Sequence, residues 1–155
     1  MRYEVSVIFE IANTAISIMV ISALISLSFL LPEKDGFFTG EATKTKKFLV
    51  LTSLLWIFTS MGNFLETLAR IFESSLVDVL RVNVIRSFGT QVTLGKLLVF
   101  QILSALVICL LAPRLKKNGG AIWLLLIALA GLIAPVFQSH SSSLGSHGLA
   151  IGSLV

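Results

Sequence analysis

Residues 92–112 read VTLGKLLVFQILSALVICLLA and are followed directly by Pro113. Lys96 is the only charged residue in this run, and Gln101 is the only one with an amide side chain. About 20 consecutive, mostly apolar residues are enough for a helix to cross the hydrocarbon core of a bilayer. Proline cannot continue such a helix. The run therefore predicts a membrane-spanning helix that ends before Pro113.

Three further apolar runs lie on either side of this one, at residues 5–31, 48–69 and 121–137. The first ends at Pro32, and it lacks the basic start and small-residue cleavage site of a signal peptide, so we interpret it as a retained span. A last run, residues 149–155, is too short to span and follows a linker rich in Ser and Gly at residues 138–148. We interpret it as the start of a fifth helix.

Between the second and third spans lies a segment with apolar residues at helical spacing, namely Phe72, Leu76, Leu80 and Val84. Charged residues fall between them, as expected of an amphipathic helix in the membrane interface. The pattern predicts such a helix near residues 72–86, or an ordinary surface helix that caps the bundle. The fold class is therefore an all-α polytopic membrane helix bundle, with four spans, the start of a fifth and one interfacial helix. We expect residues 1–155 to be a single membrane-embedded domain, the N-terminal fragment of a longer protein.

The composition favours a lipid environment, because 55% of the 155 residues are hydrophobic and 13% are charged. Soluble domains contain about 25% charged residues. The net charge of +4 comes from basic residues in short loops, and no basic patch is interleaved with aromatic residues, so we expect no nucleic-acid partner. The single cysteine, Cys109, has no partner for an intrachain disulfide.

The distribution of basic residues predicts the orientation in a bacterial inner (plasma) membrane. Cytoplasmic loops carry an excess of Lys and Arg. The connections after the first and third spans hold seven basic residues, and the opposite side holds four: Lys34, Lys44, Lys46, Lys47, Arg114, Lys116 and Lys117 against Arg2, Arg70, Arg81 and Arg86. The N-terminus is then extracytoplasmic, as is the segment between residues 138 and 148.

Polar side chains gather at the predicted extracytoplasmic end of the spans, whereas the other end has no comparable set. They are Glu10, Asn13, Asn63, Glu66, Lys96, Gln101, Gln138, His140 and His147. A charge at the centre of a bilayer costs roughly 2.5–3.5 kcal/mol on insertion scales, so such residues pair, face water or bind something. Lys96 paired with Glu10 or Glu66, or side chains reaching to the interface, is the purely structural alternative.

His140 and His147 are the only histidines and the first candidates for a metal site. Neutral imidazole binds copper well, and both residues belong to one short extracytoplasmic segment, so both can face one site. If that segment is helical, they share one face about two turns apart. Met61 offers a thioether, which suits Cu(I), and Glu66 and Glu10 are possible helpers in the same site.

The sequence contains no enzyme signature. It has no phosphate-binding loop, no HExxH zinc motif and no Gly-x-Ser-x-Gly nucleophile elbow. Residues 141–143 are serines close to His140, but no acidic residue accompanies them. We therefore expect no catalytic activity.

Residues 87–155 resemble the copper resistance protein D (CopD) family, and most closely the actinobacterial form fused to a cytochrome c oxidase assembly domain. The step Gly95-Lys96 stands where that family has a Gly-Arg-like step, and the basic turn from Arg114 to Asn118 follows. The step Ser139-His140-Ser141 stands where the family has Gly-His-Ala, and His147 opens a Leu- and Ala-containing helix. Lysine for arginine, and serine for Gly and Ala, are departures from the pattern.

This resemblance implies an integral membrane protein for copper transport or copper delivery and resistance at the extracytoplasmic face. Its partners would be the lipid bilayer, the copper ion, and an extracytoplasmic copper-binding protein or an oxidase assembly domain. A non-transporting scaffold subunit for cytochrome oxidase assembly is the alternative. A b-type haem bundle is less consistent with the sequence, because haem ligation in such a bundle needs histidines on facing helices and both histidines flank one segment.

Overall fold

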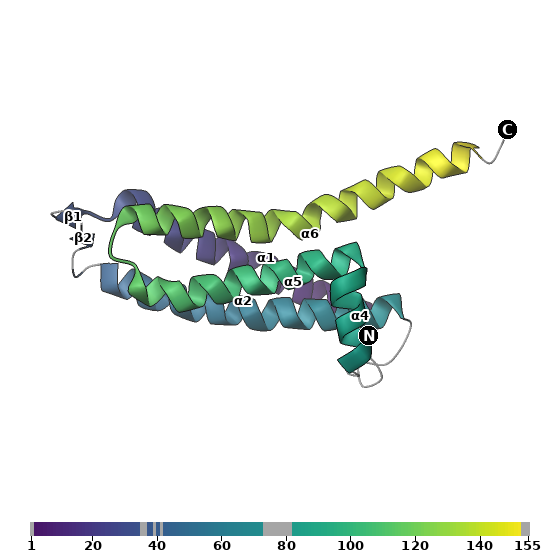
Figure 1. The fold of residues 1–155 in the computed structure, drawn as a ribbon, viewed down its shortest axis with the longest axis horizontal. Coiled ribbons are helices and arrows are strands. Elements are labelled where there is room, and N and C mark those ends of the chain that lie inside the picture. Colours follow the sequence, from purple (N-terminus) through teal and green to yellow (C-terminus); the bar gives the residue numbers. More distant parts are fainter. Residues whose placement is uncertain (1, 35–36, 39, 41, 73–81, 153–155) are drawn as a thin grey trace.

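Four long helices connected at alternating ends form the molecule, as the computed structural model shows (Figure 1). They are α1 (Arg2–Ile25), α2 (Ala42–Ile71), α5 (Thr93–Leu111) and α6 (Asn118–Gly152). A π-helical turn, η1 (Ser26–Leu30), continues α1, and a 3-10 turn, η2 (Ala112–Arg114), follows α5. The structure describes the backbone of residues 2–34, 37–38, 40, 42–72 and 82–152. Within these ranges it describes side chains from residue 7 to residue 135, apart from residues 33, 34, 37 and 82.

The connections at one end of the bundle are tied to each other by backbone hydrogen bonds. Strands β1 (Glu33–Lys34) and β2 (Phe37–Phe38) pair antiparallel, with Glu33 opposite Phe38. The Phe38 backbone N–H donates to the Lys116 carbonyl at 3.0 Å, which joins this hairpin to the turn between α5 and α6. Two loops far apart in the sequence therefore form one end of the bundle.

A short helix, α4 (Val82–Gln91), lies across the opposite end of the bundle (Figure 1). The predicted interfacial helix near residues 72–86 overlaps α4 only at residues 82–86, because residues 73–81 lie outside those the structure describes. The helix continues beyond the predicted limit to Gln91, where extended backbone at Val92 separates it from α5. Phe88, on the inner face of α4, packs edge-to-face on Phe64 of α2, with ring centroids 5.2 Å apart.

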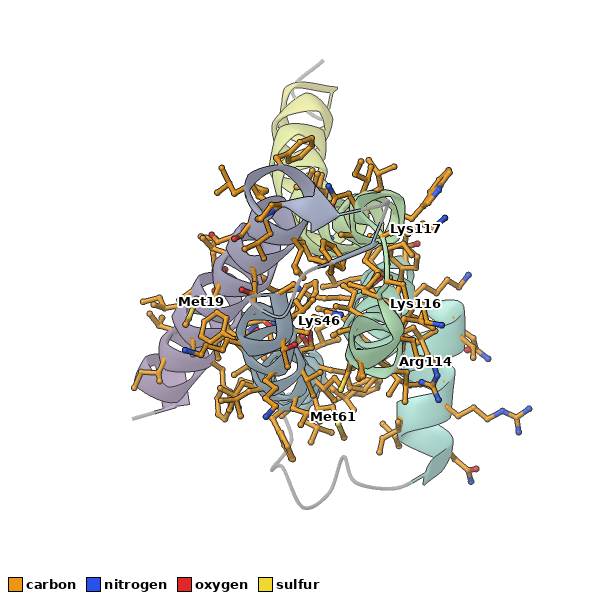
Figure 2. The ribbon with its side chains drawn as sticks, turned by 90° about the vertical axis from the view of Figure 1, so that its left-hand side faces the viewer. Met19, Lys46, Met61, Arg114, Lys116 and Lys117 are labelled. Atoms are coloured by element: carbon orange, nitrogen blue, oxygen red, sulfur yellow. The ribbon has the colours of Figure 1, made fainter. Side chains whose placement is uncertain are left out.

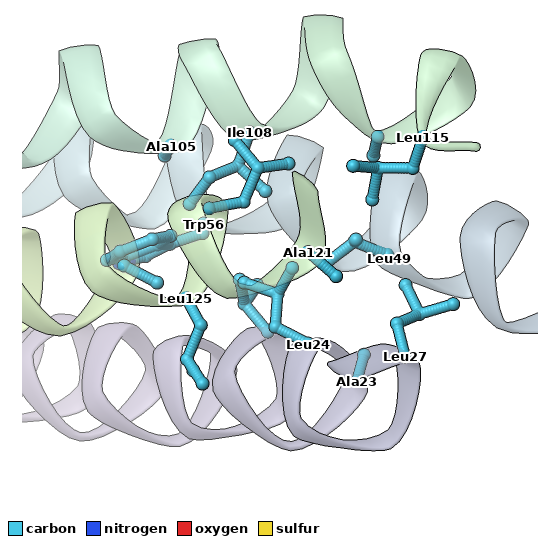
Figure 3. Close-up of a cluster of buried hydrophobic side chains, with 14 of the residues drawn as sticks. Ala23, Leu24, Leu27, Leu49, Trp56, Ala105, Ile108, Leu115, Ala121 and Leu125 are labelled. Carbon is cyan, nitrogen blue, oxygen red and sulfur yellow. The ribbon is translucent and has the colours of Figure 1, made fainter. Parts of the chain in front are cut away.

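The four long helices surround one another in a ring in which α1 packs on α2 and α6, and α5 packs on the same two helices. Buried apolar side chains fill the half of the bundle nearer the hairpin (Figure 3). Trp56 is fully buried at the centre of this half, among Leu24, Leu49, Ile108 and Leu125. A second, smaller cluster lies under α4 and contains Phe64, Leu68, Phe88 and Leu98.

The outer faces of the same helices expose large apolar side chains. Phe29, Leu30, Phe58 and Trp123 are each 65–74% exposed, and they come from three different helices. A soluble monomer rarely exposes extensive contiguous apolar surface, whereas lipid chains are a suitable solvent for it. Four helices are long and apolar enough to cross a membrane, which confirms the predicted bundle of four spans.

Two boundaries differ from the prediction. Helix α2 begins at Ala42 rather than near Phe48, because Lys44, Lys46 and Lys47 are good helix formers and Lys46 donates a hydrogen bond to the Leu115 carbonyl. The linker expected at residues 138–148 is not present as a break between helices, since α6 is one helix from Asn118 to Gly152. The fourth span and residues 149–152, which the sequence assigned to the start of a fifth helix, therefore form one element. The backbone N–H and C=O groups of Ser and Gly form the hydrogen bonds of a helix as those of other residues do, so the helix continues through them.

Helix α6 changes direction along its length, and its C-terminal part leaves the bundle (Figure 1). Pro135 lies inside this helix. A proline in a helix interior removes one backbone hydrogen bond and its ring clashes with the preceding turn, which bends the helix. The residues before Pro135 therefore belong to the four-helix ring, and the residues after it project from one end.

The turn between α4 and α5 depends on the absence of a side chain at Gly95. A Cβ atom at this position would collide with the Phe88 carbonyl oxygen and lie 3.0 Å from the Phe88 ring. If residue 95 carried a methyl group, the backbone of α4 could not lie as close to α5 as it does. Gly95 thus allows Phe88 to reach its place in the smaller apolar cluster.

We expect Gly95→Ala to destabilise the protein by about 1–3 kcal/mol, because the collision involves backbone that must move away. Thermal unfolding in detergent micelles measures the effect. Gly119→Ala is the matched control, since a Cβ atom there meets nothing within 4 Å and alanine favours a helix. Equal stability of the two variants would contradict the close packing of α4 on α5.

Candidate functional site

A polar cleft of about 160 Å³ opens at the end of the bundle next to α4. All four long helices contribute to its wall. The lining residues are Glu10, Asn13, Thr14, Asn63, Thr67, Arg70, Leu94, Leu98, Gln101, Leu132 and Pro135. Most of these carry oxygen or nitrogen side-chain atoms, in contrast to the apolar half of the bundle below them.

Helical spacing explains how these side chains come together. Residues three and four apart lie on one face of a helix. Glu10, Asn13 and Thr14 follow this spacing on α1, and Asn63, Thr67 and Arg70 follow it on α2. The sequence analysis identified Glu10, Asn13, Asn63 and Gln101, and the structure brings these four together. It missed Thr14, Thr67 and Arg70, although their spacing from the identified residues was a usable signal.

Asn13 fixes α1 to α2 at the base of the cleft. Its side-chain oxygen accepts a hydrogen bond from the Ser60 hydroxyl at 2.8 Å and lies 3.2 Å from the Thr59 hydroxyl. Asn13 is 5% exposed, so these bonds compensate for its burial. Because the oxygen is engaged with α2, the group that Asn13 retains for other partners is its NH2.

The side-chain oxygen of Gln101, unlike that of Asn13, accepts no hydrogen bond. The Gln101 side chain is 2% exposed and lines the cleft from α5, yet its Oε1 atom has no hydrogen-bond partner. A buried acceptor without a donor costs roughly 1–3 kcal/mol. The Ser28 and Ser53 hydroxyls and the Trp56 Nε1 atom, which lie outside the cleft, are buried without a partner in the same way.

The remaining predicted site residues with described side chains lie elsewhere. Glu66 is half-buried but outside the cleft lining, and Lys96 is exposed and also outside it. Met61 is 48% exposed, and the other thioether in the first two spans, Met19 of α1, is 43% exposed. Figure 2, which looks along the bundle from the hairpin end, shows both methionines on the outside of the helices. The structure therefore brings Glu10 to the cleft, but not Glu66 or Met61.

His140 and His147 lie on α6 beyond Pro135, with backbone in a helix and not in the expected loop. Their side chains, like that of Gln138, lie outside the described residues. Seven helical residues rise about 10 Å and return to nearly the same face. His140 is five residues, or about 7.5 Å of helix, beyond Pro135 at the cleft. The two histidines are thus placed one after the other along the helix that leaves the cleft.

Basic side chains occupy the end of the bundle opposite the cleft. Figure 2 shows Lys46, Arg114, Lys116 and Lys117 at this end. The Lys46 ammonium donates to the Leu115 carbonyl at 2.7 Å and lies 5.2 Å from the centre of the Phe38 ring. This lysine therefore links the start of α2 to a backbone carbonyl in the connection between α5 and α6. The separation of the polar cleft from the basic end agrees with the polar asymmetry predicted from the sequence.

A complete metal site is not formed by the residues that the structure describes, since among them no three His, Cys, Asp or Glu side chains cluster. Glu10 is the one carboxylate of the cleft lining. Any metal bound here would need amide or hydroxyl oxygens, water, or the histidines of α6 as additional ligands.

Fold and cleft together define a polytopic helical membrane protein with a polar site at one end of its bundle. Residues 11–149 match the model of the copper resistance protein D-like, N-terminal domain family. The chain belongs to this family, and it is therefore a membrane protein of copper resistance in general. The match confirms the resemblance to the copper resistance protein D family and extends it over the first two spans. Neither a curated relative nor a solved structure matches the chain.

The bond between Asn13 and Ser60 should be visible as a coupling between the two residues. In a double-mutant cycle of Asn13→Ala and Ser60→Ala, we expect a coupling free energy of about 0.6 kcal/mol and at most about 1.7 kcal/mol, the average and the maximum measured for hydrogen bonds between membrane helices. Unfolding in mixed detergent micelles provides the measurement. Asn13→Ala combined with Ser22→Ala, an exposed serine on α1, is the control pair and should be additive. Additivity in both pairs would rule out the bond.

Proposed function

We propose that this domain accepts copper at the extracytoplasmic face of a bacterial inner membrane, for transport across it or delivery to a partner. Family membership supports copper as the cargo. The observation that carries the location is the polar cleft at the end of the bundle opposite Lys46, Arg114, Lys116 and Lys117. Basic residues favour the cytoplasmic side, so the cleft would open to the outside.

The helix that leaves the cleft supports a route for the metal. His147 and His140 follow one another on α6, and Pro135 of the same helix lines the cleft. Imidazole nitrogen is a good copper ligand, and Glu10 offers a carboxylate in the cleft itself. Copper would be taken up first at the histidines and would then pass toward Glu10. The positions of Glu66 and Met61 outside the cleft lining offer no support for the direct roles that we predicted for them.

Copper binding by the full chain tests this proposal. We expect saturable binding in the wild-type protein, and binding at least tenfold weaker in the double variant His140→Ala/His147→Ala, because two imidazole ligands are lost. Competition titration with a chromophoric chelator, performed separately for Cu(I) and Cu(II), provides the measurement. Met19→Leu, on the outer face of α1, is the matched control and should bind copper as the wild type does.

Equal copper binding by the double variant and the wild type, or no binding by either, would refute the proposal. The alternative would then be a scaffold that holds an oxidase assembly domain without moving copper.

The orientation has a test of its own. In a Cys109→Ala background, we expect Arg86→Cys on α4 to react with a membrane-impermeant maleimide added to intact spheroplasts. Lys116→Cys should react only after the membrane is permeabilised. Both native side chains are exposed, so access to the reagent and not burial determines the result. Labelling of position 116 from outside would invert the topology and place the cleft in the cytoplasm.

A further inference from the structure

We propose that the connection between α5 and α6 binds the phosphate headgroup of an anionic phospholipid, in the membrane leaflet at the hairpin end of the bundle. The surface consists of Arg114, Lys116 and Lys117, which we call the basic turn, and of the exposed apolar side chains that border it on α5 and α6. This inference does not depend on copper, since it concerns the end of the bundle opposite the cleft.

The basic turn concentrates positive charge that the sequence does not offset nearby. It places three basic residues within four positions, and no acidic residue follows Asp78 in the sequence. Helices α5 and α6 therefore supply no carboxylate to this turn. The neighbouring connection adds no net negative charge, because residues 32–47 contain four basic and three acidic residues: Lys34, Lys44, Lys46 and Lys47 against Glu33, Asp35 and Glu41.

A contact within the protein brings a fourth cation to the same place. The Lys46 ammonium is 2.7 Å from the carbonyl oxygen of Leu115, the residue between Arg114 and Lys116. Figure 2 shows the four basic side chains at this end of the bundle, namely Lys46, Arg114, Lys116 and Lys117. Cations that lie near one another repel, and an anion among them offsets this repulsion. The arrangement therefore favours an anionic partner.

Arg114 is already positioned for a phosphate group. Its Nη1 atom donates to the Leu110 carbonyl at 2.6 Å, which holds the guanidinium near the end of α5 although the side chain is exposed. A guanidinium has five N–H donors in a fixed planar arrangement and often binds phosphate through two of them. Because Leu110 uses one donor, the others are available to a ligand. Binding then costs less side-chain entropy than it would for a freely rotating side chain.

The apolar side chains that border the turn indicate a lipid and not a free phosphate ion. Leu110 and Leu111 in the last turn of α5 are 55% and 43% exposed, and Trp123 near the start of α6 is 71% exposed. At 1.5 Å per residue, all three lie within about 9 Å of the basic turn along their helices. Tryptophan is enriched where a helix passes from the headgroups into the hydrocarbon. The acyl chains of a lipid bound at the turn would therefore meet an apolar surface.

The exposed basic residues at the other end of the bundle lack this arrangement. Arg86 on α4 and Lys96 on α5 are ten residues apart, with the extended backbone at Val92 between them. They share that end of the bundle with Glu10 of the cleft and with Glu66, which lies near the end of α2. We expect them to attract an anionic lipid less strongly, so they provide a matched pair of charges for the test.

Lipid binding by the full chain in a neutral detergent tests the proposal, with native mass spectrometry as the measurement. We expect the wild type to bind phosphatidylglycerol more tightly than phosphatidylcholine with the same acyl chains. In Arg114→Gln/Lys116→Gln, the affinity for phosphatidylglycerol should fall at least tenfold, because each basic residue near an anionic membrane surface contributes a factor of about five. The control Arg86→Gln/Lys96→Gln also replaces one exposed arginine and one exposed lysine, and it should keep the wild-type affinity.

A second variant separates lipid binding from an effect on the fold, since Arg114→Gln also removes the hydrogen bond to Leu110. Lys116→Glu leaves that bond in place and changes an exposed side chain, so the lipid-free protein should melt at the wild-type temperature. We expect its affinity for phosphatidylglycerol to fall at least fivefold and its affinity for phosphatidylcholine to stay the same.

Three results would overturn the proposal. Equal affinity of the wild type for the two lipids would show that the basic turn does not select anionic headgroups. An equal loss of affinity in Arg114→Gln/Lys116→Gln and in the control would assign binding to net charge and not to this surface. Displacement of the lipid by an equal concentration of inorganic phosphate would identify a site for a free anion. None of these measurements involves copper, so the proposed function stands or fails separately.

Discussion

The bilayer imposes one constraint on which the rest of the structure depends, namely that every backbone N–H and C=O inside it must find a partner within the protein. Helices meet this demand locally, so four apolar runs become four helices whose connections lie at the two ends. Even the sharp turn between α4 and α5 keeps its bonds, because the Val92 N–H donates to the Phe88 carbonyl and the Lys96 N–H donates to the Val92 carbonyl. Polar side chains are then not needed to satisfy the backbone, and they can bind each other or line the cleft.

The interior of the bundle is divided between two kinds of surroundings. Toward the hairpin, buried apolar side chains pack around Trp56 (Figure 3). Toward α4, the interior widens into the polar cleft. The border lies near Gly131, where a Cβ atom would be 2.8 Å from the Ser104 Cβ and 3.4 Å from the Trp56 ring. Close approach of α6 to α5 and to the Trp56 ring at this glycine closes the bundle below the cleft, so a ligand that enters the cleft meets a packed floor.

This division relates the copper proposal to the fold. A site near one membrane surface avoids most of the cost of placing charges in hydrocarbon. The cleft brings one carboxylate, three amides and one guanidinium together there, and Pro135 directs the helix that carries both histidines away from the same place. The packed floor means that copper passing inward requires the helices to separate around Trp56, whereas copper delivered to an extracytoplasmic partner does not.

The sequence by itself determined the four spans, their approximate limits, and the polar end that contains Glu10, Asn13, Asn63 and Gln101. These follow from hydrophobicity and helical period, which are local properties. It did not determine that α6 continues through the Ser- and Gly-rich residues, because backbone hydrogen bonding in the helix overrides weak local preferences. Only the tertiary structure decided that Met61 faces outward, that Glu66 lies outside the cleft, and that Arg70 and Thr67 line it. The rotation of each helix about its axis is set by which neighbours it packs against, and a single run of residues does not record it.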